Sequence, residues 1–271
     1  MSVRLAVLGA TGRMGRRVAD QVGPEFELVG GIASGALGEA DARALGYPRV
    51  VALADAAAVV ERSEVVLDVA APEALASLLR DCAPALGRRA LVSGTTGLAE
   101  EQERGLARLA GTAPVVRAAN FAVGVALLRR LARELAANLS ADEWDVEVSE
   151  THHRGKQDAP SGTALALGRA VAEGRGADLA SLRADGRSGA VGPRPVGQIG
   201  FHALRGGTVA GEHRVAFLGP HERVELAHRA EDRALFARGA LRACAWVRGQ
   251  PPGLYSMDDV LGLAREARAA T

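Results

Sequence analysis

The first stretch of the chain constrains the fold more than any other. An apolar run of strand length, Val3–Leu8, is followed at once by Gly9-Ala-Thr-Gly12-Arg-Met-Gly15, and a helix-like segment continues to Val22. A strand, a glycine turn and a helix in this order are typical of dinucleotide-binding folds. The three glycines would in turn permit a tight turn, let the backbone approach a pyrophosphate, and let helix and strand pack closely. The alternative is a glycine turn without a ligand.

Strand-like and helix-like segments alternate as far as residue 117. Apolar strand-like runs recur at 26–32, 64–70, 89–93 and 114–117, helix-like runs occur at 54–61, 72–82 and 100–110, and 37–50 is expected to be a loop with a short helical turn. This alternation predicts an α/β fold with a doubly wound parallel sheet of the Rossmann type. Ligands of such sheets bind beyond the carboxyl ends of strands. Gly94–Gly97 and Ala118–Phe121 follow two predicted strands and are therefore expected beside the first glycine turn.

The pattern of elements changes after a helix-like run at 123–138. A strand at 143–150, a helix at 162–173, a loop at 174–197, three strands at 199–204, 208–217 and 223–228, and helices at 233–247 and 253–263 are expected next. Consecutive strands predict a second, mixed α/β domain inserted before the C-terminal helices. The predicted domains are residues 1–121 with 233–271, which would bind the dinucleotide, and residues 122–232.

Composition excludes few classes, but its charge balance is informative. The 33 basic and 32 acidic residues give a net charge of +1, which supports neither a nucleic-acid nor a membrane partner. Cys82 and Cys244 lie in apolar runs and are expected to be buried free thiols. No signal peptide is visible, and no run reaches the roughly 18 to 20 apolar residues of a membrane helix, so we expect a soluble cytoplasmic protein.

A second stretch rich in chemistry runs from Glu150 to Leu165, where two histidines, an arginine, a lysine and an aspartate fall within seven residues. His152 would supply a proton near neutral pH, and Lys156 a cation for substrate carboxylates. Gly162 and Thr163 would add N–H groups at a helix N-terminus. The pattern predicts a dicarboxylate site with a proton donor.

Two other interpretations of this stretch stay open. One is a solvated polar loop, in which Asp158 would simply pair with Lys156, Arg154 or the backbone. The other is a metal site that recruits His202 or His213. We expect no metal, because adjacent residues such as His152 and His153 point opposite ways on a strand and no Cys or Asp spacing supports zinc.

The end of the second predicted strand bears on cofactor choice. An acid is usual there in NAD-preferring sites, but this chain has Ala33-Ser34. Without an acid, nothing repels the 2′-phosphate of NADP, and Ser34 would donate a hydrogen bond. The choice between NADPH and NADH is therefore open, and the sequence favours NADPH or dual use of both.

The chain resembles the 4-hydroxy-tetrahydrodipicolinate reductase family of the diaminopimelate route to lysine. The resemblance runs in family order through Gly9–Gly15, Ser93–Gly97, Ala118–Phe121, Glu150–Ala164, Ile199–Phe201, Gly211–His213 and Gly253–Val260. The run His152-His-Arg-x-Lys-x-Asp-Ala-Pro-Ser-Gly-Thr163 is its most specific part. Two departures are Ala33-Ser34, where the family often has an acid and sometimes a following base, and Ala70-Ala71, which replaces a polar pair.

The resemblance implies a hydride transfer from NADPH or NADH to a cyclic imine dicarboxylate. His152 would be the proton donor and Lys156 its partner, while His153, Gly162 and Thr163 would bind the substrate. The residues that would line the cofactor are Gly9, Ala10, Thr11, Gly12, Arg13, Met14, Ser34, Gly94, Thr95, Thr96, Ala118, Ala119, Asn120 and Phe121. Residues 122–232 would bind substrate and assemble a homotetramer. The alternatives are another NAD(P)-dependent amino- or diamino-acid dehydrogenase and a non-catalytic dinucleotide sensor.

Overall fold

The computed structural model describes residues 2–263, and the chain divides into two compact units. Unit 1 holds the residues up to Ala122 together with those from Ala234 onward, and unit 2 holds Val123–Arg233. Within residues 2–263, no helix has both the length and the apolar character needed to cross a membrane.

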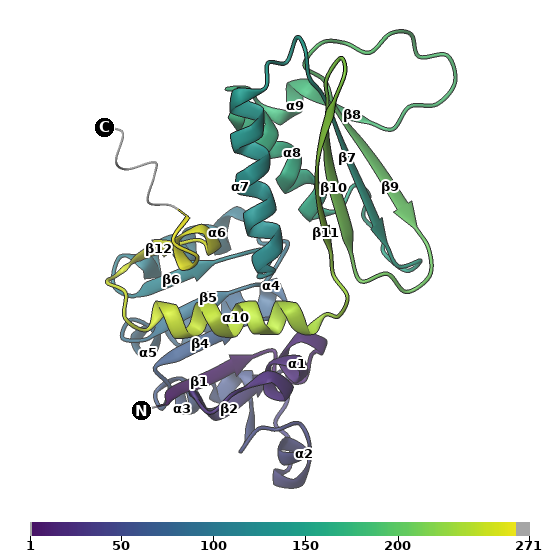
Figure 1. Ribbon diagram of the computed structural model, residues 1–271. Helices are drawn as coiled ribbons and strands as arrows, with labels where there is room; N and C mark the ends of the chain where they lie inside the picture. Colours follow the sequence, from purple (N-terminus) through teal and green to yellow (C-terminus); the bar gives the residue numbers. More distant parts are fainter. Residues whose placement is uncertain (1, 264–271) are drawn as a thin grey trace. The chain divides into compact units, whose positions relative to one another are not determined.

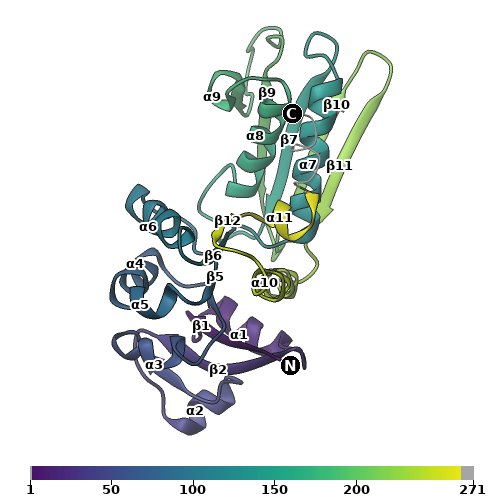
Figure 2. The same cartoon turned by 90° about the vertical axis from the view of Figure 1, so that its left-hand side faces the viewer.

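Unit 1 is built on a parallel sheet of seven strands in the order β12-β6-β5-β4-β1-β2-β3. The strands are β1 (Val3–Leu8), β2 (Phe26–Ala33), β3 (Val50–Ala52), β4 (Val65–Asp68), β5 (Ala90–Ser93), β6 (Pro114–Arg117) and β12 (Gly253–Tyr255). The helices are α1 (Arg13–Gln21), α2 (Glu39–Ala44), the short 3-10 helix Leu53–Asp55, α3 (Ala57–Val60), α4 (Pro72–Asp81), α5 (Ala83–Leu86), α6 (Glu100–Ala110), α10 (Ala234–Val247) and α11 (Met257–Val260). Helices α1 and α10 lie on one side of the strands, and α4, α5 and α6 lie on the other (Figure 2).

The predicted Rossmann-type doubly wound sheet is confirmed, because β1 lies between β2 and β4 and the strand order reverses there. Two expectations about short strands were wrong. Val50–Ala52 is a strand on the β2 edge, where a loop was expected. Gly253–Tyr255 is a strand paired with β6, where a helix was expected over 253–263, and the helix begins only at Met257.

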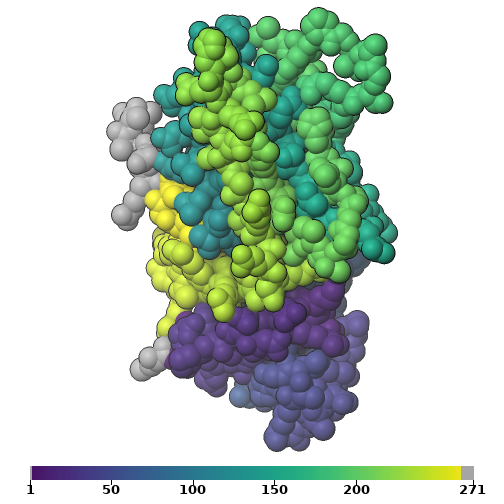
Figure 3. All heavy atoms as spheres, turned by 45° about the vertical axis from the view of Figure 1, so that its right-hand side comes forward, coloured from purple at the N-terminus to yellow at the C-terminus, as the bar shows by residue number. Residues whose placement is uncertain are grey.

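Helix α10 completes unit 1 by returning the chain to the sheet after unit 2. Its surface lies directly against that of α1 (Figure 3). Gly239 lets α10 also approach the segment after β6, because a Cβ there would stand 1.9 Å from the carbonyl oxygen of Phe121. Aliphatic side chains fill the core between the sheet and α4, α5 and α6, including Leu75, Leu78 and Leu106.

Unit 2 is a mixed five-stranded sheet in the order β11-β10-β7-β9-β8, covered on one face by two helices (Figure 1). Its elements are α7 (Val123–Asn138), β7 (Asp145–His152), α8 (Gly162–Gly174), α9 (Leu179–Leu182), β8 (Arg183–Asp185), β9 (Ile199–Arg205), β10 (Glu212–Leu218) and β11 (Arg223–Arg229). Strands β7, β8 and β9 run parallel, while β10 is antiparallel to both of its neighbours. The expected loop at 174–197 was wrong in part, since it contains α9 and β8.

The register of β7 places its chemistry on the helix-covered face. Alternate residues Val146, Val148, Glu150 and His152 are buried, as the twofold period of a strand requires. The strand therefore continues two residues beyond Glu150, where it was expected to end, and it includes His152. The helices pack closely on this face because Gly168 of α8 leaves room for the Phe201 ring, which a Cβ would meet at 2.2 Å.

Candidate active site

A hollow of about 340 Å³ opens at the carboxyl ends of the strands of unit 1. Its walls come from α1, from the segments after β4, β5 and β6, and from α10. The residues that line it are Met14, Val69, Ala70, Gly94, Thr95, Thr96, Ala119, Asn120, Phe121 and Phe236. Seven of these were predicted as cofactor residues, and their loops meet here because parallel strands present their carboxyl ends at one edge.

The glycine turn between β1 and α1 fits a dinucleotide. Gly9 has a φ of +88°, and a Cβ there would stand 2.8 Å from the carbonyl oxygen of Val69. A Cβ on Gly15 would stand 2.3 Å from the oxygen of Gly9, so helix and turn approach more closely than any side chain allows. Helix α1 begins at Arg13, directly after Gly12, and its first N–H groups lack partners within the helix. Such an N-terminus suits a pyrophosphate.

The remaining predicted cofactor residues are not among those that line the hollow. Gly9, Ala10, Thr11, Gly12 and Arg13 belong to the turn and the start of α1, Ser34 follows β2 and is exposed, and Ala118 follows β6 and is buried. Val69, Ala70 and Phe236 line the hollow and were missed. The first two directly follow β4, which was a predicted strand, so the rule about strand ends would have found them. Phe236 comes from α10, and no local pattern marks it.

A buried carboxylate is hydrogen-bonded to residues that line this hollow. Asp68, the last residue of β4, accepts hydrogen bonds from Ser93 Oγ at 2.7 Å and from Thr95 Oγ1 at 2.8 Å. It also accepts from the Ala70 N–H at 3.1 Å. Burial raises the pKa of Asp68, although these hydrogen bonds oppose the rise. Asp68 thus joins the segments after β4 and β5 that line the hollow.

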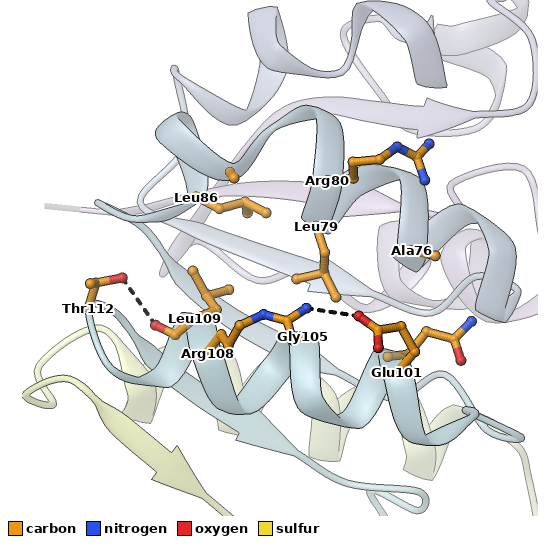
Figure 4. Close-up of a pocket in the computed structure, with 11 residues that line it drawn as sticks. Ala76, Leu79, Arg80, Leu86, Glu101, Gly105, Arg108, Leu109 and Thr112 are labelled. Atoms are coloured by element: carbon orange, nitrogen blue, oxygen red, sulfur yellow. Dashed lines mark hydrogen bonds and ion pairs between the residues drawn. The ribbon is translucent and has the colours of Figure 1, made fainter.

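A larger hollow of about 480 Å³ lies between α4, α5 and α6 of the same unit (Figure 4). Leucine side chains, including Leu79 and Leu109, face it, and Arg108 at its rim is paired with Glu101 at 3.1 Å. Its walls are helix sides rather than strand ends, and no predicted site residue is among those that line it. The smaller hollow is therefore the candidate cofactor site.

In unit 2 the predicted substrate residues lie on β7, on the loop after it and at the start of α8. Ser161 caps α8, because its Oγ accepts the Ala164 N–H at 3.1 Å. Gly162 and Thr163 form the first turn, as predicted from the Pro-Ser-Gly-Thr sequence, and a Cβ on Gly162 would meet open space. The first-turn N–H groups and the helix dipole make this end suitable for a carboxylate.

His152 is buried, with 8% of its surface exposed, and its ring is fixed from one side. Nδ1 lies 2.5 Å from Oε2 of Glu150, while Nε2 points toward Gly211, where a Cβ would stand 3.0 Å away. Burial lowers the pKa of His152 below its ordinary 6.5, and the charges of Lys156 and Arg205 act in the same direction. Glu150 opposes them.

Glu150 is almost completely buried and fully hydrogen-bonded. Arg205 donates to both of its oxygens, at 2.8 and 2.7 Å, and the Ser161 N–H donates at 3.1 Å. Burial alone would raise the pKa of Glu150, but the hydrogen bonds from Arg205, His152 and Ser161 outweigh it and lower the pKa. Glu150 is therefore an acceptor for the His152 N–H.

His153 and Lys156 belong to the loop after β7. The His153 N–H donates to the Val209 oxygen at 2.8 Å, and the His153 side chain is less buried than that of His152. Lys156 Nζ lies 2.7 Å from Asp158, which is one of the pairings considered for that aspartate. Among residues 2–263, no three His, Cys, Asp or Glu side chains are grouped so that they could hold a metal.

Two further residues of this site were not assigned to substrate chemistry from the sequence. Arg205 comes from the end of β9, opposite His152 in the register of the sheet. His213 of β10 places Nε2 3.2 Å from Ser161 Oγ, and its ring meets the His152 ring edge-on at a centroid distance of 5.1 Å. Burial lowers the pKa of His213 to about 4, and His152 adds to the effect, so this imidazole is neutral near pH 7.

Comparisons with known proteins cover almost the whole chain. Residues 3–121 match the family model "Dihydrodipicolinate reductase, N-terminus", and residues 124–261 match "Dihydrodipicolinate reductase, C-terminus". The 4-hydroxy-tetrahydrodipicolinate reductase of Caulobacter vibrioides is 46% identical over 263 residues, which are 97% of this chain and 98% of the relative. That of Gluconacetobacter diazotrophicus is 47% identical, with 96% and 98% covered.

Solved structures show the same fold. Dihydrodipicolinate reductase from Paenisporosarcina sp. TG-14, bound to dipicolinate, has a TM-score of 0.70 at 24% identity, with 94% of this chain and 98% of that chain covered. The DAP dehydrogenase of C. glutamicum, bound to DAP, has a TM-score of 0.54 at 16% identity, with 94% and 93% covered. At these identities both likenesses concern the fold alone. The alternative of another amino-acid dehydrogenase is not favoured, because both family models and the curated relatives name the reductase. The chain belongs to the dihydrodipicolinate reductase family and is an NAD(P)H-dependent oxidoreductase that acts as a 4-hydroxy-tetrahydrodipicolinate reductase.

Proposed function

We propose that His152 donates the proton in this reduction and that Lys156 supplies a cation beside it. The observation that carries the proposal is that Glu150 contacts both His152 and the Ser161 N–H at the start of α8, while the charge of Lys156 acts on the His152 ring. Nε2 of His152 is the ring atom turned away from Glu150, so it is the atom available for the transfer. His153, Gly162 and Thr163 would bind the substrate carboxylates, which prefer helix N–H groups and nearby cations.

The proton transfer has a clear chemical purpose. Hydride addition to a conjugated imine leaves an electron-rich enamine, and a positioned acid that protonates it contributes roughly 10² to 10⁴ in rate. His152 is neutral near pH 7 because its pKa is lowered by burial first and by Lys156 and Arg205 next. A bound dicarboxylate would bring negative charge to the site and raise that pKa, so substrate binding itself would load the proton onto Nε2.

Unit 1 would hold the cofactor. Gly9, Ala10, Thr11, Gly12, Arg13 and Met14 would cradle the pyrophosphate, Ser34 would contact the adenosine ribose, and Gly94, Thr95, Thr96, Ala118, Ala119, Asn120 and Phe121 would surround the nicotinamide. The close approaches at Gly9 and Gly15 support the first of these assignments. The reduced nicotinamide supplies the hydride when bound. Because no acid follows β2, NADPH or dual use is favoured over NADH alone.

Unit 2 would also mediate self-association as a homotetramer. Its sheet has helices on one face only, and its other face carries exposed Leu204 and alternating charged residues. Analytical ultracentrifugation would test this, since a monomer at micromolar concentration would contradict it. A small-molecule dicarboxylate as the substrate and a cytoplasmic location complete the proposal.

The decisive experiment follows oxidation of NADPH and of NADH in the presence of freshly generated cyclic substrate. We expect turnover with NADPH at least as efficient as with NADH. His152→Gln should bind cofactor normally and lose about 10² to 10⁴ in kcat. A His152→Gln enzyme with nearly intact kcat would show that the proton comes from elsewhere.

A further inference from the structure

A buried carboxylate and a partly buried guanidinium lie behind the imidazole of His152. Glu150 comes from the same strand and Arg205 from the end of β9, and their side chains are 1% and 19% exposed. Arg205 donates Nη1–H to Oε2 of Glu150 and Nη2–H to Oε1, which is the bidentate geometry of a strong charge-assisted pair.

The hydrogen bonds of Glu150 determine which nitrogen of His152 carries the proton. Oε1 accepts from Arg205 and from the Ser161 N–H, and Oε2 accepts from Arg205 and lies 2.5 Å from His152 Nδ1. An ionised carboxylate only accepts hydrogen bonds, so Nδ1 must be the donor in this contact. In the neutral ring Nε2 is then left without a proton, and it faces away from Glu150.

Arg205 also reaches the loop that carries Lys156. Its Nη2 donates to the carbonyl oxygen of Asp158 at 2.7 Å, and the Asp158 carboxylate binds Lys156. Arg205 therefore connects Glu150, which lies behind His152, to the loop that carries Lys156.

We propose that Glu150 and Arg205 are positioning residues for the proton transfer of His152. Glu150 holds the proton on Nδ1 and reserves Nε2 for the substrate, and Arg205 keeps Glu150 ionised so that it remains an acceptor. The inference rests on the proposed role of His152 as proton donor.

The need for both charges follows from burial. A carboxylate buried without a cation would be costly to keep ionised, and Glu150 would tend to take the His152 proton instead. The groups that face His152 are Glu150 on its own strand, Arg205 from β9, His213 from β10 and Lys156 from the loop. Only Glu150 among these favours the protonated ring, because the two cations repel it and His213 is neutral near pH 7.

Glu150→Gln gives a direct test, because it should reverse the tautomer of His152. Two donors that cannot reverse, Arg205 Nη2–H and the Ser161 N–H, converge on the Oε1 position, whereas only Arg205 Nη1–H does so at Oε2. The amide oxygen of the introduced glutamine would therefore stay at the Oε1 position, and its NH₂ would face Nδ1. Nδ1 would then accept and the proton would move to Nε2. We would record ¹⁵N-histidine NMR spectra at pH 7.5 and assign His152 by its loss in His152→Gln. Wild type should show protonated Nδ1, and Glu150→Gln should show protonated Nε2; the same tautomer in both would overturn the proposal.

A kinetic test separates positioning from mere stabilisation. The kcat of Glu150→Gln should fall by about 10- to 100-fold, a part of the full value of general acid catalysis. The high-pH limb of its kcat profile should move to lower pH, because the charge that favours the protonated His152 is gone. The high-pH limb of Arg205→Gln should move to higher pH, because the Glu150–His152 pair holds its shared proton more tightly without the neighbouring cation, whichever of the two groups carries it. High-pH limbs that stay in place in both variants, or that move in the same direction, would contradict the proposal. Arg104→Gln, which removes an exposed paired arginine of α6, is the matched control and should resemble wild type.

The two tests also distinguish this inference from the proposed function. The tautomer is read without turnover, so it stands even if His152→Gln proves active and another group donates the proton. Thermal melting would establish that each variant folds. If Arg205→Gln does not fold, Arg205→Lys replaces it. The lysine keeps the charge but loses the bidentate geometry, so this variant should have a lower kcat without the upward shift of the high-pH limb.

Discussion

Gly211 leaves room for the outward nitrogen of His152: a Cβ on Gly211 would stand 3.0 Å from Nε2. That separation is shorter than the roughly 3.5 to 4.0 Å at which nonbonded heavy atoms attract one another best. Nδ1 on the opposite side is bound to Glu150, so the ring cannot turn away without losing that hydrogen bond. Any side chain at residue 211 must therefore displace the proposed proton donor.

Gly211→Ala should lower kcat by about tenfold or more, because it moves His152 while leaving its chemistry intact. Cofactor affinity should not change, since the proposed cofactor residues belong to unit 1. Steady-state kinetics and NADPH titration would measure the two effects. Gly207→Ala is the control in the same loop, because its φ of +52° is unfavourable for a side chain, like the +157° of Gly211, but a Cβ there meets open space. Equal losses in both variants would mean that the loop, and not the contact with His152, is responsible.

The parallel sheet was predictable because its central strands are apolar runs that alternate with helical segments. Three short strands were missed: β3, β8 and β12 have three residues each. Segments of this length carry too little periodicity to mark them as strands. They form because an established neighbour offers its edge, as β6 does to Gly253–Tyr255.

In the candidate site too, the residues that lie close together in sequence were predictable and those far apart in sequence were not. His152, Lys156 and the α8 N-terminus were found because they are contiguous in sequence. Arg205 lies 55 residues beyond Glu150, and only the parallel register of β7 and β9 brings the two together. No local pattern distinguishes Arg205 from the many exposed arginines of this chain.

The aromatic wall of the cofactor hollow gives a second prediction. A Cβ on Gly94 would stand 2.4 Å from Cε2 of Phe121, so Gly94→Ala should push this ring into the hollow. We expect the Kd for NADPH to rise about tenfold, equivalent to about 1.4 kcal/mol. Titration calorimetry would measure it, with Gly249→Ala as a control whose Cβ has no close neighbour in unit 1. An unchanged Kd in Gly94→Ala would remove Phe121 from the cofactor site.

Cofactor preference should respond to a single charge at the end of β2. Ser34→Asp would place a carboxylate at the exposed residue proposed to contact the ribose, where it can bond a ribose hydroxyl of NADH and repel the 2′-phosphate of NADPH. The ratio of kcat/KM for NADPH to that for NADH should fall about tenfold or more. Ser34→Asn is the matched control, because the asparagine has nearly the same shape as the aspartate without the charge. An equal change in both variants would indicate a steric effect rather than discrimination by charge.

His213 predicts how stability depends on pH. Its pKa is about 4 in the folded protein because burial disfavours its charge, against an ordinary value of 6.5. Between these pH values the unfolded chain binds a proton that the folded chain does not, so the free energy of unfolding falls as the pH is lowered. The slope approaches about 1.4 kcal/mol per pH unit and amounts to roughly 3 kcal/mol in all.

Urea unfolding of wild type and His213→Gln between pH 7.5 and 4.5 would measure this contribution. At pH 7.5 the variant should be less stable than wild type, because its contact with Ser161 is weakened. The difference in free energy of unfolding between the two proteins should narrow or reverse as the pH falls, because only wild type must keep His213 neutral. His152, whose pKa is also lowered, remains in both proteins, so the difference reports His213 together with its coupling to His152. His221→Gln, which removes an exposed histidine, should follow wild type. If the difference in free energy of unfolding between wild type and His213→Gln stays constant across this pH range, His213 does not couple folding to protonation.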